Sequence, residues 1–66
     1  MKASRLMAIL MLLQTQGRAT APALAERLEV SVRTILRDMD ELSAAGVPVY
    51  ADRGRAGGWR LMAGWK

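Results

Sequence analysis

The spacing of apolar residues changes once along the chain, and this change restricts the fold more than any other feature. Before Gly46, apolar side chains recur every three or four residues, which is the period of a helix with one buried face. From Val47 onward they occupy every second position, which is the period of a strand. A chain of 66 residues with this pattern is predicted to be mainly α with a small β-hairpin at its end.

The first helix is predicted over residues 4–16, and Gly17 ends it. Its buried stripe follows i, i+3, i+4, i+7 spacing and consists of Leu6, Ile9, Leu10 and Leu13. Met7 and Met11 form a second apolar strip beside it. We expect the two methionines to pack beneath a neighbouring element; the alternative is a surface for self-association, which flexible thioethers suit.

The second helix is predicted over residues 21–28, with Thr20 as its N-cap and Pro22 in its first turn. Its apolar face consists of Leu24, Ala25 and Leu28. A helix this short is unstable alone, so packing against the rest of the domain must hold it in place.

The third helix is predicted over residues 31–45, with Ser31 as its N-cap and Gly46 beyond its end. Its predicted buried stripe consists of Val32, Ile35, Leu36, Met39 and Leu42. Roughly opposite this stripe, at about 100° per residue, lie Arg33, Thr34 and Arg37. Three acidic residues follow in the later turns and are expected to form a solvated face; they are Asp38, Asp40 and Glu41. The helix dipole favours the opposite order of charges, so the early arginines indicate a negatively charged partner.

A β-hairpin is predicted over residues 47–62, with a glycine-rich tip, "GRAGG", at Gly54–Gly58. Most of the net charge of +4 lies in residues 47–66, which contain four basic residues and one acidic residue. We expect Trp59 to close the core beneath the hairpin and Arg60 to face outward. A basic surface confined to one part of a small domain favours a polyanion, and nucleic acid above all.

Composition excludes several other functions. The chain has no cysteine and no histidine, which removes the usual zinc sites and the Ser/His and Cys/His nucleophile pairs. We therefore expect no enzyme activity, no metal and no cofactor. The apolar run Leu6–Leu13 is too short to span a bilayer, and cleavage after Ala21 as a secretory leader would leave too little chain to fold. The expected location is the cytoplasm, at the nucleoid, with no membrane partner.

Three helices followed by a two-stranded hairpin is the order of a winged helix-turn-helix. Only Glu29 and Val30 separate the second helix from the cap of the third, which projects the start of the third helix outward. Such a recognition helix enters the major groove of double-stranded DNA, while the wing follows the backbone or minor groove. The predicted DNA-binding residues are Thr20, Ser31, Arg33, Thr34, Arg37, Arg53, Arg55 and Arg60. The alternative is a winged-helix protein–protein interaction module, for which an apolar outer face would be the sign.

The combined motifs resemble the N-terminal winged helix-turn-helix of WYL-domain (DeoR-like or YafY-like) bacterial transcriptional regulators. The resemblance covers residues 4–62 and rests on "LAERLEVSVRTILRDMDEL" and "AAGVPVYADRGRAGGWRL". It implies contact with an operator by Ser31, Arg33, Thr34 and Arg37, and backbone contact by the wing at Arg53 and Arg55.

The resemblance has two further implications. Such regulators usually carry a C-terminal effector-sensing domain, so this chain is expected to be an isolated or truncated DNA-binding domain. We expect this domain to be a monomer, or at most a weak dimer through Met7 and Met11, and the full-length protein to be a homo-oligomer. One departure is Glu29, which stands where the family often has glycine; a left-handed backbone there would cost glutamate about 1 kcal/mol.

Overall fold

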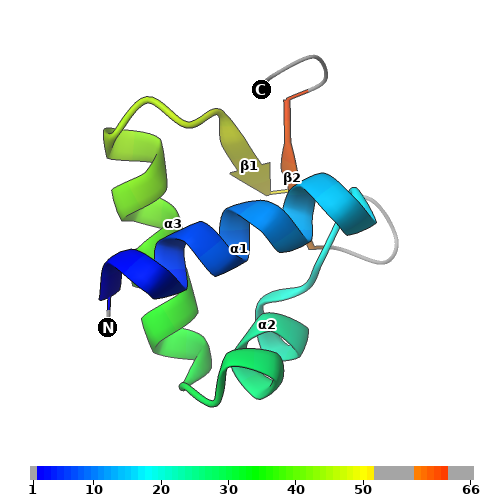
Figure 1. The fold of residues 1–66 in the computed structure, drawn as a ribbon, viewed down its shortest axis with the longest axis vertical. Helices are drawn as coiled ribbons and strands as arrows, with labels where there is room; N and C mark the ends of the chain where they lie inside the picture. The colour runs from blue at the N-terminus through cyan, green and yellow to red at the C-terminus, as the bar shows by residue number, and fades with distance from the viewer. Residues whose placement is uncertain (1, 52–57, 63–66) are drawn as a thin grey trace.

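The computed structural model describes residues 2–51 and 58–62, which form three helices and a two-stranded antiparallel sheet (Figure 1). The helices are α1 (Lys2–Gln16), α2 (Ala21–Leu28) and α3 (Val32–Ala44), and the strands are β1 (Val49–Ala51) and β2 (Trp59–Leu61). This arrangement confirms the predicted fold class, a mainly helical domain with a hairpin. The first helix begins two residues earlier than predicted, at Lys2, and the third lies between its two predicted end residues.

Two hydroxyl side chains begin α2 and α3. The Thr20 Oγ1 accepts a hydrogen bond from the Ala23 amide at 3.1 Å, and the Ser31 Oγ accepts one from the Thr34 amide at 3.1 Å. Each bond satisfies one of the amides that the first turn of a helix leaves without a backbone partner. Both starts were predicted from the residue type at these positions.

A residue with a left-handed backbone conformation follows the last residue of α2, and another lies just beyond the end of α3. Gly46, at φ 95°, follows α3, and the next amide, that of Val47, donates to the Leu42 carbonyl at 3.0 Å. The same bond pattern closes α2, where the Val30 amide donates to the Ala25 carbonyl at 3.0 Å. There the left-handed residue is Glu29, with φ 59°, the one non-glycine residue of positive φ in the described ranges.

The base of the hairpin is joined to the segment between α1 and α2. β1 and β2 pair with Val49 opposite Leu61, and Ala19 forms an isolated bridge with Trp59 on the other edge of β2. In this bridge the Trp59 amide donates to the Ala19 carbonyl at 2.7 Å, and the Ala19 amide donates to the Trp59 carbonyl at 3.1 Å. The hairpin is therefore anchored to the helices by main-chain bonds as well as by packing.

The core lies where the three helices and the base of the hairpin meet. Its buried apolar residues come from all three helices and the connection at residue 19; they are Ile9, Leu13, Ala19, Ala21, Leu24, Ala25, Ile35, Met39 and Leu42. Trp59 is half-buried and packs against this cluster, as predicted. Leu6 and Leu10 of the predicted α1 stripe are only partly buried.

Candidate functional site

The outward surface of α3 differs from the one that the apolar pattern predicts. Val32 and Leu36 were expected in the core, but they are 40% and 43% exposed. The buried positions are instead Ile35, Asp38, Met39 and Leu42. At 100° per residue the buried arc is rotated by about 50° from the predicted stripe. The rotation brings Asp38 inward and carries Val32 and Leu36 to the surface.

An ion pair explains why an aspartate occupies a core position. The Arg5 Nε donates to Asp38 Oδ2, and the Arg5 Nη2 donates to Asp38 Oδ1 at 3.0 Å, so the pair is bidentate. Asp38 is 1% exposed, while the Arg5 side chain is 22% exposed. A buried carboxylate is tolerated when it is paired and hydrogen-bonded in this way. The prediction that Asp38 belongs to a solvated face was therefore wrong, and Arg5 was not recognised as its partner.

The negative charge of Asp38 also favours the protonated form of Arg5. The pKa of the Arg5 guanidinium is raised above its ordinary value, chiefly because its side chain donates hydrogen bonds to Asp38. Desolvation opposes this shift, whereas the negative charges of Asp38 and Glu41 add to it. The pair ties the middle of α3 to the start of α1.

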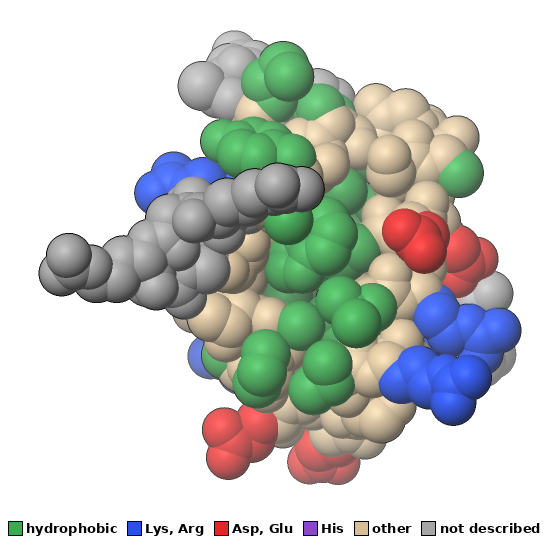
Figure 2. Space-filling view, turned by 180° about the vertical axis from the view of Figure 1, so that it is seen from behind, with side chains coloured by type: hydrophobic (Ala, Val, Ile, Leu, Met, Phe, Trp, Pro, Cys, Tyr) green, Lys and Arg blue, Asp and Glu red, His purple; other side chains and the backbone are tan. Residues whose placement is uncertain are grey.

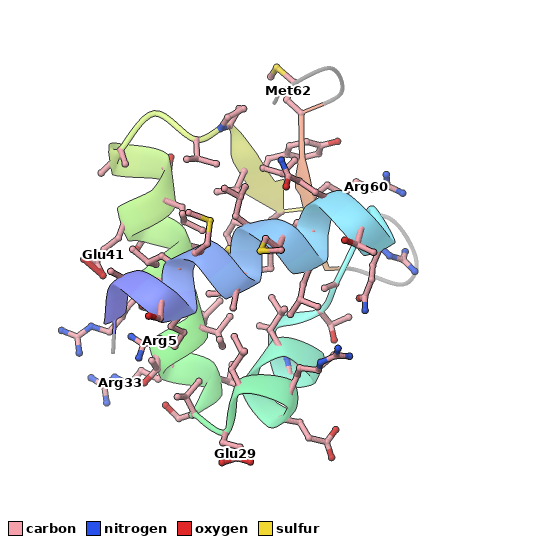
Figure 3. All side chains as sticks on the ribbon, in the orientation of Figure 1. Arg5, Glu29, Arg33, Glu41, Arg60 and Met62 are labelled. Atoms are coloured by element: carbon pink, nitrogen blue, oxygen red, sulfur yellow. The ribbon has the colours of Figure 1, made fainter. Side chains whose placement is uncertain are left out.

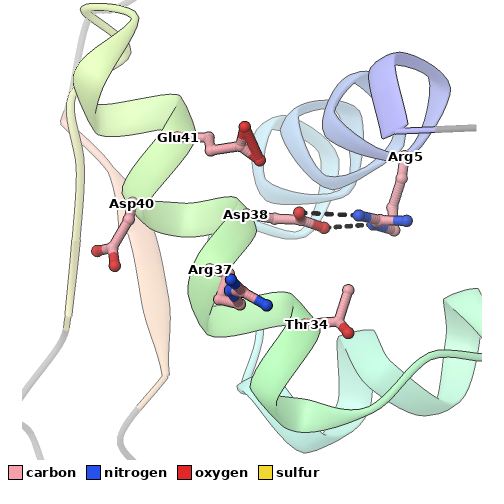
Figure 4. A pocket seen from close by; sticks show the side chains of 6 residues that line it. All are labelled: Arg5, Thr34, Arg37, Asp38, Asp40 and Glu41. Atoms are coloured by element: carbon pink, nitrogen blue, oxygen red, sulfur yellow. Dashed lines mark hydrogen bonds and ion pairs between the residues drawn. The ribbon is translucent and has the colours of Figure 1, made fainter.

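A surface hollow of about 510 Å³ lies around this ion pair. Its lining combines cations, acids and one hydroxyl from α1 and α3: Arg5, Thr34, Arg37, Asp38, Asp40 and Glu41 (Figure 4). Asp40 points away from the pair, on the other side of α3 (Figure 4). Asp38 is already bound to Arg5, so these acids do not form the free carboxylate pair that general acid–base chemistry requires.

Hydrogen-bonding and cationic groups occupy the exposed start of α3. Arg33 and Arg37 are exposed, one turn apart, and Arg33 extends away from the body of the domain (Figure 3). The Ser31 and Thr34 hydroxyl oxygens lie 3.0 Å apart at the first turn. Four of the predicted binding residues thus come together at one end of one helix.

The remaining predicted binding residues lie elsewhere. Thr20 is half-buried at the start of α2, where its hydroxyl oxygen caps the helix. Arg60 faces outward from β2, opposite Tyr50 of β1, and is exposed as predicted. Arg53 and Arg55, at the predicted wing tip, lie outside the described residues.

The exposure of two methionines on α1 shows that another prediction was wrong. Met7 and Met11 were expected to pack beneath a neighbouring element, but each is 57% exposed. The reason is that α1 buries its opposite side, through Ile9 and Leu13, against the core.

Residues 2–51 and 58–62 provide neither a metal site nor a membrane-spanning helix. These ranges contain no group of three or more acidic, cysteine or histidine residues close enough together to hold a metal ion. None of the helices in them has the length and apolar character needed to cross a membrane.

Comparison with known proteins identifies a protein family and a curated relative. Residues 5–60 match the model of a protein family described as HTH domain, the helix-turn-helix. An uncharacterized HTH-type transcriptional regulator of Bacillus subtilis (strain 168), YobV, is 44% identical over 62 residues, which are 94% of this chain and 20% of that protein. The chain therefore spans about a fifth of the length of this relative. No solved structure matches the chain.

Proposed function

The chain belongs to the HTH domain family, and on that premise we propose that it binds double-stranded DNA sequence-specifically as part of a bacterial transcriptional regulator. In this proposal α3 is the recognition helix and enters the major groove, and the hairpin is the wing. The cellular location is then the cytoplasm, at the nucleoid, where operator DNA lies.

The observation that carries this proposal is the composition of the exposed start of α3. Ser31, Arg33, Thr34 and Arg37 gather at the N-cap and in the first two turns of α3, directly after the three-residue connection from α2. The N-terminal part of a recognition helix is the part that meets base edges. Cations placed against the preference of the helix dipole are explained by a polyanion that faces them.

The residues divide into two roles. Arg33 and Arg37 have the reach and the planar donors to read guanine O6 and N7. The hydroxyls of Ser31 and Thr34 lie beside free amides of the first turn and suit a phosphate, as does Thr20 at the start of α2. Arg60 and the wing arginines Arg53 and Arg55 are assigned to the phosphate backbone.

Within the family, we place the chain with the WYL-domain, DeoR-like regulators, on the motifs in α3 and the hairpin. In a regulator of that kind a separate domain senses the effector and joins two copies, so that the dimer reads two half-sites. The domain described here is then a monomer on its own. Sedimentation at micromolar concentration tests this, and a tight dimer would contradict it.

The function itself is tested by selecting bound sites from random duplex DNA with the purified domain. The selected duplex then serves to compare Arg33→Ala and Arg37→Ala with the wild type. Removing a base-reading arginine should cost about 1–3 kcal/mol on this duplex and relax the preference at one base pair. Arg27→Ala is the matched control, because it removes an equal charge from an exposed site at the end of α2. If selection enriched no sequence, the proposed function would be wrong.

A second candidate, a protein-contact role, is favoured by the exposure of Met7 and Met11 on α1. It is compatible with DNA binding, since the two methionines belong to a different helix from the arginines. Concentration-dependent association that Met7→Ala and Met11→Ala abolish would support this role, and a monomer at all concentrations would exclude self-association.

A further inference from the structure

We propose that Val32 and Leu36 form an apolar base-reading strip that recognises the methyl groups of thymine in the major groove. This inference rests on the proposed function and names a chemical feature of the operator that the arginines do not read. It arises from the rotation of α3, which leaves two apolar side chains at the surface instead of in the core.

Apolar and cationic residues lie on separate parts of the exposed surface of the first two turns of α3. At 100° per residue, Val32, Leu36, Arg33 and Arg37 follow one another around α3 at about 0°, 40°, 100° and 140°. The arc therefore has an apolar half and a cationic half. Figure 2 shows the domain from behind, with hydrophobic side chains over the centre of this face and Lys/Arg side chains at its edges.

The apolar half lies where base edges are read. Val32 is the first residue of α3 and Leu36 is one turn later, so both belong to the part of a recognition helix that enters the groove. Their separation along the helix axis is about 6 Å, which is one to two base steps. Each side chain already has more than a third of its surface exposed, so contact with DNA needs no rearrangement of the core.

The thymine methyl group is the part of a base that an apolar strip of this kind can recognise. In the major groove the bases present hydrogen-bonding groups and one apolar group, the C5-methyl of thymine. An aliphatic side chain in the groove therefore gains free energy only by covering that methyl. The adjacent Arg33 and Arg37 match a polyanion better than the uncharged surface of a protein partner, which is why DNA is favoured as the occupant.

Deoxyuridine provides a direct probe, because it lacks this methyl and keeps the hydrogen-bonding groups of thymine. Each thymine of the selected duplex is replaced singly by deoxyuridine, and Kd is measured for the wild type. At least one replacement should weaken binding about fourfold, the equivalent of about 0.8 kcal/mol for one buried methyl. That penalty should fall below about 1.5-fold in Leu36→Ala or in Val32→Ala, while Leu36→Met should retain most of it.

Met7→Ala is the matched control, because it truncates a more exposed apolar side chain on another helix. It should leave the deoxyuridine penalty unchanged. A melting curve for each variant checks folding, and exposed side chains are expected to change stability little.

The outcomes separate the two proposals. A domain that selects no sequence refutes the proposed function. A domain that selects a sequence but tolerates deoxyuridine at every position refutes this inference alone. A penalty that survives in both Val32→Ala and Leu36→Ala also refutes it, because other residues would then read the methyl. Unchanged DNA affinity in both variants would refute it as well, because the strip would then make no contact with DNA.

Discussion

Replacing Glu29 by glycine should stabilise the domain. Glu29 ends α2 with φ 59°, and its amide donates to the Glu26 carbonyl at 3.3 Å. A side chain with a Cβ costs about 1–2 kcal/mol in this left-handed conformation. Glycine removes that strain but gains about 0.5–1 kcal/mol of backbone entropy in the unfolded chain. The net effect expected for Glu29→Gly is about 0.5–1 kcal/mol of added stability.

The assay is thermal unfolding followed by circular dichroism, with denaturant unfolding alongside. For a domain of this size the gain corresponds to a rise of about 2–8 °C in Tm. Glu29→Ala is the control: it removes the same carboxylate from the end of α2 but keeps the Cβ and its strain. Loss of the charge near the helix C-terminus contributes equally to both variants. The difference between the glycine and alanine variants therefore isolates the backbone term.

The reasoning would be refuted if the glycine variant were no more stable than the alanine variant. Equal stability would mean that the left-handed strain is no larger than the backbone entropy that glycine adds to the unfolded chain, about 0.5–1 kcal/mol. A gain shared by both variants would instead trace to the charge.

Three further predictions concern the ion pair, the base of the hairpin and the wing. Asp38→Asn should lower the free energy of unfolding by about 1.5–3 kcal/mol, because it removes the charge from hydrogen bonds to a buried group; a denaturant midpoint equal to that of wild type would show that the pair with Arg5 contributes nothing. Gly58→Ala should destabilise the domain by about 1–3 kcal/mol, since Gly58 has φ 103° and a Cβ there would lie 3.0 Å from the Arg18 Cγ and 3.2 Å from the Ala19 oxygen; an unchanged Tm would contradict this. Arg55→Ala should weaken binding to all duplexes alike and flatten the plot of log affinity against log salt by about 0.9; a loss confined to the selected duplex would mean that the wing reads sequence.

The sequence by itself determined the elements and most of their ends, because these depend on local chemistry. The hydroxyls of Thr20 and Ser31 begin two helices, and Gly17 and Gly46 end two, by interactions that reach no further than five residues along the chain. The change of period after Gly46 separated helices from hairpin in the same way. The helix-turn-helix arrangement and the exposed arginines of α3 followed from this pattern of short segments.

The tertiary structure alone decided which way α3 faces. Its apolar residues are spread over about 120° of the helix surface, so the sequence is compatible with more than one rotation. Arg5 selects between them: it lies 33 residues before Asp38, and its guanidinium makes a core position acceptable for a carboxylate. That pairing turns Val32 and Leu36 outward, a result that no local pattern predicts. The side chains on the outer surface of α3 were therefore set by a contact between two distant parts of the chain.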